Sequence, residues 1–167
     1  RQLFPIHISA NKADSAKGTP WNAIESNGII QPTMADMELA LRRADSGGMI
    51  SYNSGEDTFE IQDESKLNSA QLNALAGMKD KLSEAGGTGV AQLLSKVLFD
   101  ALDHVVVYPV ADETGWKDGE GRVLPDAFVV PNNIEAKQLA YKVHSDLGEG
   151  FIKAVDGRSR RVVGADH

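Results

Sequence analysis

Apolar and polar positions along the chain form two kinds of pattern. Short apolar runs bounded by polar or turn-forming residues predict strands, at residues 6–8, 29–30, 105–110, 128–130, 151–155 and 161–163. Apolar residues at helical spacing predict helices, at residues 34–44, 69–85, 90–102 and 134–143. The stretch 51–66 is polar and irregular, so we predict no regular element there.

Small and turn-forming residues mark the ends of the predicted helices. The pair Gly47-Gly48 ends the first helix, and the pair Gly86-Gly87 ends the second. Thr88 is expected to cap the third helix, whose apolar stripe is the strongest helical pattern in the chain. From residue 104 the order becomes strand, strand, helix, strand, strand, which is typical of a small α+β unit.

The composition narrows the class of protein. Of 167 residues, 41% are hydrophobic and 25% charged, as in a soluble globular protein. No apolar run approaches the roughly 20 residues that a membrane-spanning helix needs, so we expect no membrane partner. Cysteine is absent, which excludes disulfides and fits a reducing, cytoplasmic location. The net charge of −7 argues against general polyanion binding, because phosphate contacts rely on local positive charge.

A polar motif follows the first predicted strand. Asn11, Lys12 and Asp14 stand in the sequence NKAD at the exit of that strand. A carboxylate can accept both the N1–H and the 2-amino group of guanine, and such paired, charge-assisted hydrogen bonds are strong and selective. In this interpretation Asp14 reads the base, Asn11 secures neighbouring backbone and the N7 edge, and the Lys12 stem lies along the base face.

Four residues of common types also occur together by chance, and a polar turn after an edge strand is the alternative. The placement favours a ligand site, because open α/β sheets bind ligands at the carboxyl ends of their strands. Met34 and Ala35 follow the second short apolar segment and begin a helix. We therefore expect Met34 and Ala35 to belong to the guanine site, with the backbone N–H of Ala35 donating to guanine O6.

These motifs resemble a known family. The sequences NKAD, PTMADMELALRRA (residues 32–44), YPVADE and LPDAFVVP are similar to the Obg-related GTPases of the YchF-like group. The NKAD form looks closest to the archaeal and fungal branch of that group. The phrase LAYKVHSDLGEGFIKAVDGRSRRVVGADH resembles the TGS domain, a β-grasp module also found in threonyl-tRNA synthetases and ppGpp synthetases.

The resemblance implies an α/β plus α+β fold in three parts. These are the C-terminal part of a P-loop GTPase domain over 1–50, a helical segment over 51–103, and a TGS domain over 104–167. Relatives continue past a position like His167 with a final β-grasp strand. The resemblance also implies GTP or GDP as ligand, Mg²⁺ in the intact protein, and contact with the ribosome or tRNA.

Two positions bear on the ligand that the resemblance implies. The family usually has Ser where this chain has Met34, so a side-chain hydroxyl contact is lost there. Relatives classed as ATPases replace the Asp of the NKxD motif with Glu. The Asp14 of this chain therefore favours guanine.

The phosphate-binding motif of a GTPase is absent from the sequence. No GxxxxGK[ST] occurs, and the glycine-rich stretches 86–89 and 148–150 lack the Lys that reaches phosphates, so we interpret both as helix boundaries. Phosphoryl transfer depends on phosphate positioning and Mg²⁺. We therefore expect GTP hydrolysis from the intact protein but not from this segment alone, with the Mg²⁺ ligands outside it.

Basic residues cluster on a predicted strand–turn–strand near the end of the chain, at Lys153, Arg158, Arg160 and Arg161. An exposed hairpin with ordinary charges is one interpretation, and a phosphate-contacting patch for RNA is the other.

Three functions of the protein stay open. The first is a guanine-nucleotide-binding protein of the GTPase type with a TGS module for RNA or the ribosome. The second is a non-catalytic RNA- or ribosome-binding TGS module with a vestigial nucleotide-binding edge. The third is a soluble α+β domain with a chance NKAD.

Overall fold

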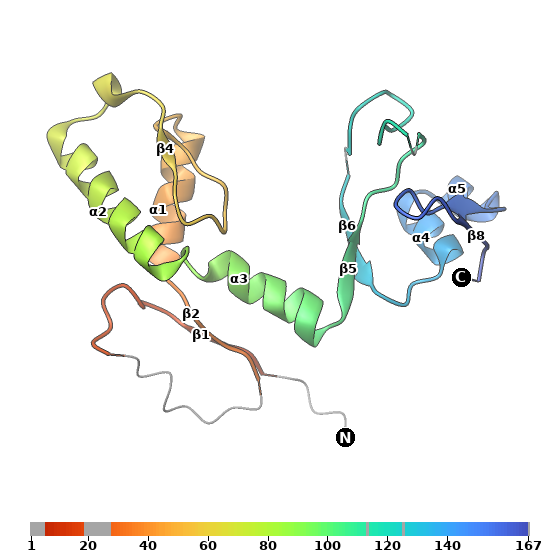
Figure 1. The fold of residues 1–167 in the computed structure, drawn as a ribbon, viewed down its shortest axis with the longest axis horizontal. Coiled ribbons are helices and arrows are strands. Elements are labelled where there is room, and N and C mark those ends of the chain that lie inside the picture. Colours follow the sequence, from red (N-terminus) through yellow and green to blue (C-terminus); the bar gives the residue numbers. More distant parts are fainter. Residues whose placement is uncertain (1–5, 19–27, 113, 125, 167) are drawn as a thin grey trace. The chain divides into compact units, whose positions relative to one another are not determined.

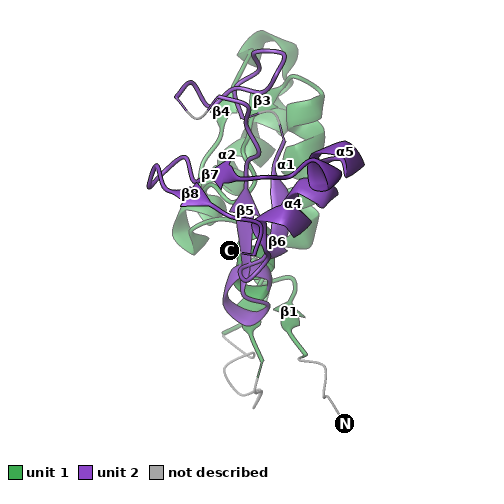
Figure 2. Ribbon diagram, turned by 90° about the vertical axis from the view of Figure 1, so that its right-hand side faces the viewer, with its two compact units in different colours: residues 1–97 green, residues 98–167 purple. Residues whose placement is uncertain are grey.

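The structure is a computed structural model of the chain, and it describes residues 6–18, 28–112, 114–124 and 126–166. The chain divides into two compact units, residues 1–97 and 98–167 (Figure 2). Each unit mixes helices with short strands, so the expected mixed α/β character is confirmed. The division into a GTPase part, a helical segment and a TGS domain stays a prediction.

The first unit begins with a parallel strand pair. Strand β1, Ile8–Ala10, pairs with β2, Ile30–Pro32, in the register Ile8↔Ile30 and Ala10↔Pro32 (Figure 1). Both strands start later than the apolar runs predict. Helix α1, Ala35–Ser46, follows β2 almost at once, so the carboxyl ends of both strands and the start of α1 meet.

The stretch 51–66 contains regular structure that the sequence analysis missed. Strands β3, Ile50–Ser51, and β4, Glu60–Ile61, form an antiparallel pair, and a 3₁₀ turn covers Glu64–Lys66. Two-residue strands are too short to show an alternating pattern, which is why the prediction of no regular element is wrong. The two buried aromatic residues between the strands, Tyr52 and Phe59, were the available signal.

Two helices complete the first unit. Helix α2, Ser69–Ala85, starts with a reciprocal capping box between Asn68 and Gln71 and ends at Gly86 in the left-handed conformation. Helix α3, Val90–Ser95, continues as a π-helical turn over Lys96–Ala101. The expected cap at Thr88 is wrong, since Gly89 occupies the cap position and the Thr88 hydroxyl donates to Glu38 instead.

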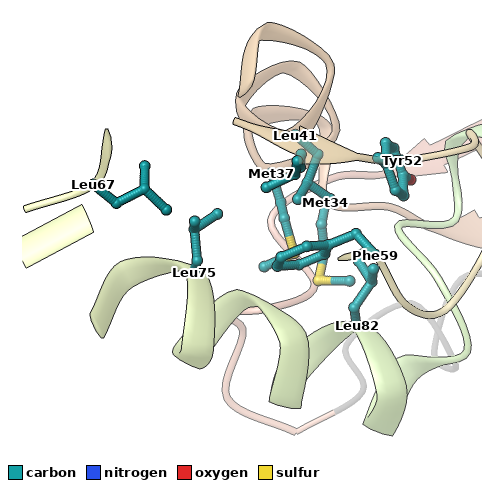
Figure 3. Close-up of a cluster of buried hydrophobic side chains, with 9 residues drawn as sticks. Met34, Met37, Leu41, Tyr52, Phe59, Leu67, Leu75 and Leu82 are labelled. Carbon is teal, nitrogen blue, oxygen red and sulfur yellow. The ribbon is translucent and has the colours of Figure 1, made fainter. Parts of the chain in front are cut away.

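The core of the first unit lies between α1, α2 and the β3–β4 pair. Figure 3 shows Leu75 and Leu82 of α2 pointing toward Met34, Met37 and Phe59. The buried cluster consists of Met34, Met37, Leu41, Ile50, Tyr52, Phe59, Leu67, Leu75 and Leu82. Burying side chains of this size stabilises a fold by roughly 1.5–3 kcal/mol each. This core fixes the start of α1 beside the end of α2.

The second unit has the predicted order of strand, strand, helix, strand, strand. Its elements are β5 (His104–Val107), β6 (Phe128–Pro131), α4 (Ala136–Val143), a short α5 (Ser145–Glu149), β7 (Ala154–Val155) and β8 (Val162–Val163). Within its described residues, β5 pairs with β6 and β7 with β8, both antiparallel, as separate two-stranded pairs. The more specific β-grasp fold therefore stays a prediction.

Candidate functional site

The exits of β1 and β2 bring the NKAD segment and the start of α1 together. The Ser9 and Thr33 hydroxyls lie 2.7 Å apart. The Thr33 N–H donates to the Ala10 carbonyl, and the Ala13 N–H donates to the Thr33 carbonyl, both at 3.0 Å. Because each loop hydrogen-bonds to the other, residues 11–14 and 33–35 form one continuous polar edge.

Asn11 links the two loops through its side chain. Its Oδ1 accepts a hydrogen bond from the Ala35 N–H at 3.0 Å. The cap position of α1, Met34, provides no side-chain cap, so Asn11 supplies the acceptor that the first turn of a helix lacks. The predicted donor to guanine O6, the Ala35 N–H, is therefore already engaged by Asn11 in this structure.

Lys12 turns the chain between Asn11 and Asp14. Its backbone φ is +62°, a left-handed conformation that costs a residue with a Cβ about 1 kcal/mol or more. The Lys12 carbonyl accepts hydrogen bonds from the N–H groups of Ser15 and Ala16, at 3.1 and 3.0 Å. The turn is thus held by its own backbone, and the Lys12 side chain is exposed.

Asp14 faces the end of α2. Its Oδ2 lies 3.5 Å from the Nζ of Lys81, and about half of the Lys81 side chain is exposed. Sequence reasoning missed Lys81, because nothing local indicates that the two residues meet. The carboxylate that was predicted to read guanine therefore has a cationic neighbour on the helical segment.

Met34 contributes only backbone to this edge. Its side chain is 4% exposed and packs in the core (Figure 3). Its N–H donates to the carbonyl of Thr88 at 2.8 Å. Of the five residues predicted for the guanine site, the structure places Asn11, Lys12, Asp14 and Ala35 at the polar edge, and it directs the Met34 side chain away from that edge.

The sequence analysis did not identify a buried carboxylate that lies next to this edge. Glu38 is 5% exposed and accepts four side-chain hydrogen bonds, from Thr88 (2.6 Å), Arg42 (2.7 Å), Tyr52 (2.8 Å) and Ser54 (2.8 Å). Burial alone raises the pKa of Glu38, and the hydrogen bonds outweigh it and lower the pKa from 4.5 to about 2. The carboxylate is therefore charged at neutral pH.

The glycine-rich loop 86–89 packs against the end of β2. Gly89 has φ +79°, and a Cβ at this position would lie 2.0 Å from the Pro32 carbonyl oxygen. Only glycine fits so close to the strand. A small pocket of about 140 Å³ lies along this contact, lined by Ala13, Gln31, Pro32, Met34, Ala85, Gly86, Gly87, Thr88, Gly89 and Gln92.

The basic cluster of the second unit lies on the β7–β8 hairpin. Lys153, Arg158, Arg160 and Arg161 are all exposed. Asp156 holds the turn, because its side chain accepts from the Ser159 hydroxyl and from the Arg158 N–H. These hydrogen bonds lower the pKa of the Asp156 carboxyl, and the hydrogen bond from Ser159 has the largest effect. The structure thus presents the three arginines on one short turn.

Among residues 6–18, 28–112, 114–124 and 126–166, no group of three or more His, Cys, Asp or Glu side chains could hold a metal ion. No helix within those same ranges is long and apolar enough to cross a bilayer.

Comparison with protein families gives a match over most of the first unit. Residues 9–112 match the family described as "Obg-like GTPase YGR210-like, G4 motif-containing domain". The match includes NKAD, the start of α1, the core and the Glu38 cluster.

Comparison with individual proteins points the same way. An uncharacterized GTP-binding protein of Methanocaldococcus jannaschii, MJ1332, is 47% identical over an alignment of 167 positions, which covers 98% of this chain and 42% of that protein. The crystal structure of a GTP binding protein from Pyrococcus horikoshii is similar with a TM-score of 0.67 and 33% identity, and the match covers 98% of this chain and 42% of that one. The chain thus spans about 42% of the length of either relative.

Proposed function

Because the chain belongs to the YGR210-like family of Obg-like GTPases, we propose that it supplies the guanine-recognition edge of a GTP-binding protein. The observation that supports this proposal is the hydrogen bond from the Ala35 N–H to the Asn11 side chain. It lies at the exits of two parallel strands, beside the Asp14 carboxylate. Relatives at 47% and 33% identity are named GTP-binding proteins, which supports the same ligand class here.

The proposed mode of recognition uses charge and hydrogen-bond direction. The Asp14 carboxylate accepts from the N1–H and 2-amino groups of guanine, which adenine lacks, and so distinguishes the two bases. The Lys12 stem lies along the base face. The Ala35 N–H donates to O6, which requires Asn11 to share this donor or to release it.

The proposed hydrolysis of GTP belongs to the intact protein. The sequence of this chain contains no P-loop, and among the described residues no acidic cluster could hold Mg²⁺. Mg²⁺ supplies charge neutralisation at the β- and γ-phosphates when it is bound. The residues of this chain contribute base selectivity, and phosphate and Mg²⁺ contacts come from elsewhere in the protein.

A second proposed function, RNA or ribosome contact, rests on the β7–β8 hairpin. Arg158, Arg160 and Arg161 are exposed on a turn that Asp156 holds in place. Exposed arginines grouped on one hydrogen-bonded turn suit phosphate contacts, which position a protein on RNA without reading sequence. We propose that the second unit is a TGS module acting in the cytoplasm. A binding module with a vestigial nucleotide edge is the alternative if guanine recognition fails.

The test is a titration of the complete gene product and of its Asp14→Asn variant with labelled GDP, ADP and xanthosine diphosphate. We expect wild type to prefer GDP and Asp14→Asn to prefer xanthosine diphosphate, because xanthine offers an acceptor at position 2 to the amide. Equal affinity of wild type for GDP and ADP would overturn guanine recognition. An unchanged GDP preference in Asp14→Asn would overturn the role of Asp14 alone.

A further inference from the structure

Three hydrogen bonds form a closed ring behind the proposed base-contacting loop. The Met34 N–H donates to the Thr88 carbonyl at 2.8 Å, and the Thr88 hydroxyl donates to Glu38 Oε2 at 2.6 Å. The Glu38 N–H donates in turn to the Met34 carbonyl at 3.0 Å, within the first turn of α1. Both backbone polar groups of Met34 are therefore engaged in this ring, one residue before Ala35.

The ring is rigid because each of its members is buried. Glu38 and Thr88 are 5% and 1% exposed, and Met34 packs in the core. The Tyr52 and Ser54 hydroxyls donate to the same carboxylate, so its orientation is fixed from a third segment. A charged, fully hydrogen-bonded group in a buried site is costly to move, since each lost donor leaves charge uncompensated.

The contact between the two loops does not depend on the ring alone. Gly89 packs directly on the Pro32 carbonyl, so the glycine-rich loop lies against the end of β2. The loop that begins at Thr33 is thereby held from β1 on one side and from residues 88 and 89 on the other.

The ring matters most when a base is bound. In this structure Asn11 engages the Ala35 N–H, and guanine O6 requires that same donor. When guanine O6 accepts a hydrogen bond from the Ala35 N–H, Asn11 is no longer the sole partner that positions Ala35. The Thr88–Met34 hydrogen bond then remains as the constraint on the residue before Ala35.

We propose that Glu38 and Thr88 are positioning residues for base recognition, which hold the Ala35 N–H in the direction of guanine O6 through the backbone of Met34. This inference rests on the proposed guanine-binding function. It assigns a role in nucleotide selectivity to the loop between α2 and α3, which carries no residue of the NKAD motif.

The experiment compares GDP, IDP and ADP binding to the complete gene product and to its Thr88→Val variant. Guanine and hypoxanthine both carry O6, whereas adenine carries a donor at that position. We expect Thr88→Val to weaken GDP and IDP equally, by about 3- to 10-fold, the range that one net hydrogen bond supports. The affinity for ADP should stay unchanged. The ratio of the GDP affinity to the ADP affinity therefore falls, while the ratio of the GDP affinity to the IDP affinity is preserved.

Two further variants separate positioning from simple destabilisation. Thr88→Ser keeps the hydroxyl and should restore the wild-type GDP:ADP ratio. Ser65→Ala removes a hydroxyl donor from a different carboxylate, Asp63, which lies outside the ring, and it should leave the ratio unchanged.

The outcomes distinguish this inference from the function on which it rests. Wild type without a GDP preference over ADP would overturn the proposed function and this inference with it. A wild-type preference that Thr88→Val leaves intact would overturn the inference alone. Equal weakening of all three nucleotides, or a Ser65→Ala effect as large as that of Thr88→Val, would assign Glu38 and Thr88 a purely structural role and overturn the inference as well.

Discussion

The side-chain oxygen of Asn11 accepts a hydrogen bond from the backbone N–H of Ala35 at 3.0 Å, across 24 residues of sequence. This contact satisfies a free N–H in the first turn of α1, a task that a residue at the cap position usually performs. Met34, at the cap, instead buries its side chain in the core. One side chain thus closes the proposed base site and supports the helix that follows it.

Asn11→Ala should lower the free energy of unfolding by about 1 kcal/mol, because it removes the only side-chain acceptor at the start of α1 within the described residues. Asn11→Asp keeps an oxygen at this position and should lose less. Urea unfolding of the two variants measures the difference. Asn53→Ala is the matched control, since among the described residues its side-chain amide donates only to Glu56, three residues away. Equal losses in Asn11→Ala and Asn53→Ala would contradict a special role for Asn11.

Glu38 should make the stability of the first unit depend on pH. Its folded pKa of about 2 lies below the ordinary value of 4.5, so its stabilising effect is complete above pH 4.5 and is lost as the pH falls toward 2. By pH 3 the loss should reach about 2 kcal/mol. Glu38→Gln cannot titrate, and its urea midpoint should vary less between pH 6 and pH 3.

The control for the pH experiment is Glu84→Gln, which removes one exposed carboxylate from α2 with the same change in charge. Its pH profile should follow wild type. Parallel profiles for wild type and Glu38→Gln would show that the Glu38 carboxylate does not carry the acid sensitivity.

Two glycine-to-alanine changes should have opposite signs. Gly89→Ala places a Cβ against the Pro32 carbonyl at a residue with φ +79°, and it should destabilise the protein by more than about 2 kcal/mol. Gly77→Ala lies within α2 with nothing within 4 Å of the new Cβ, and it should stabilise by about 0.5–1 kcal/mol. Urea midpoints of both variants test this contrast, and a tolerated Gly89→Ala would contradict the close packing of residue 89 on β2.

Charge reversal on the β7–β8 hairpin tests the proposed RNA contact. The triple change Arg158→Glu, Arg160→Glu and Arg161→Glu should abolish RNA association, and any residual binding should have a salt slope smaller by about two to three. Filter binding at several salt concentrations gives both quantities. Reversal of three exposed basic residues elsewhere, Arg43, Lys117 and Lys142, is the matched control. If the hairpin variant binds RNA as wild type does, the arginines are ordinary surface charges.

Much of the fold could be predicted from the sequence, because most of its helices and strands depend on residues that are close together along the chain. The helical spacing of Met34, Met37 and Leu41 predicted α1, and Gly86 marked the end of α2. The strand–strand–helix–strand–strand order after residue 104 is also as expected. The β3–β4 pair was missed because two residues on each side give no period, and Tyr52 and Phe59 are buried by contacts that form only in three dimensions.

The sequence by itself determined the polar residues at the proposed site and the family to which they point. The NKAD motif, and Ala35 after a second strand, are chemical patterns that can be read from single positions. The tertiary structure decided what holds them. The contacts of Lys81 with Asp14, of Thr88 with Met34, and of Tyr52, Ser54 and Thr88 with Glu38 join residues that are distant along the chain. Side-chain periodicity and motif spacing report only on local neighbours, whereas these contacts depend on how α1 and α2 pack.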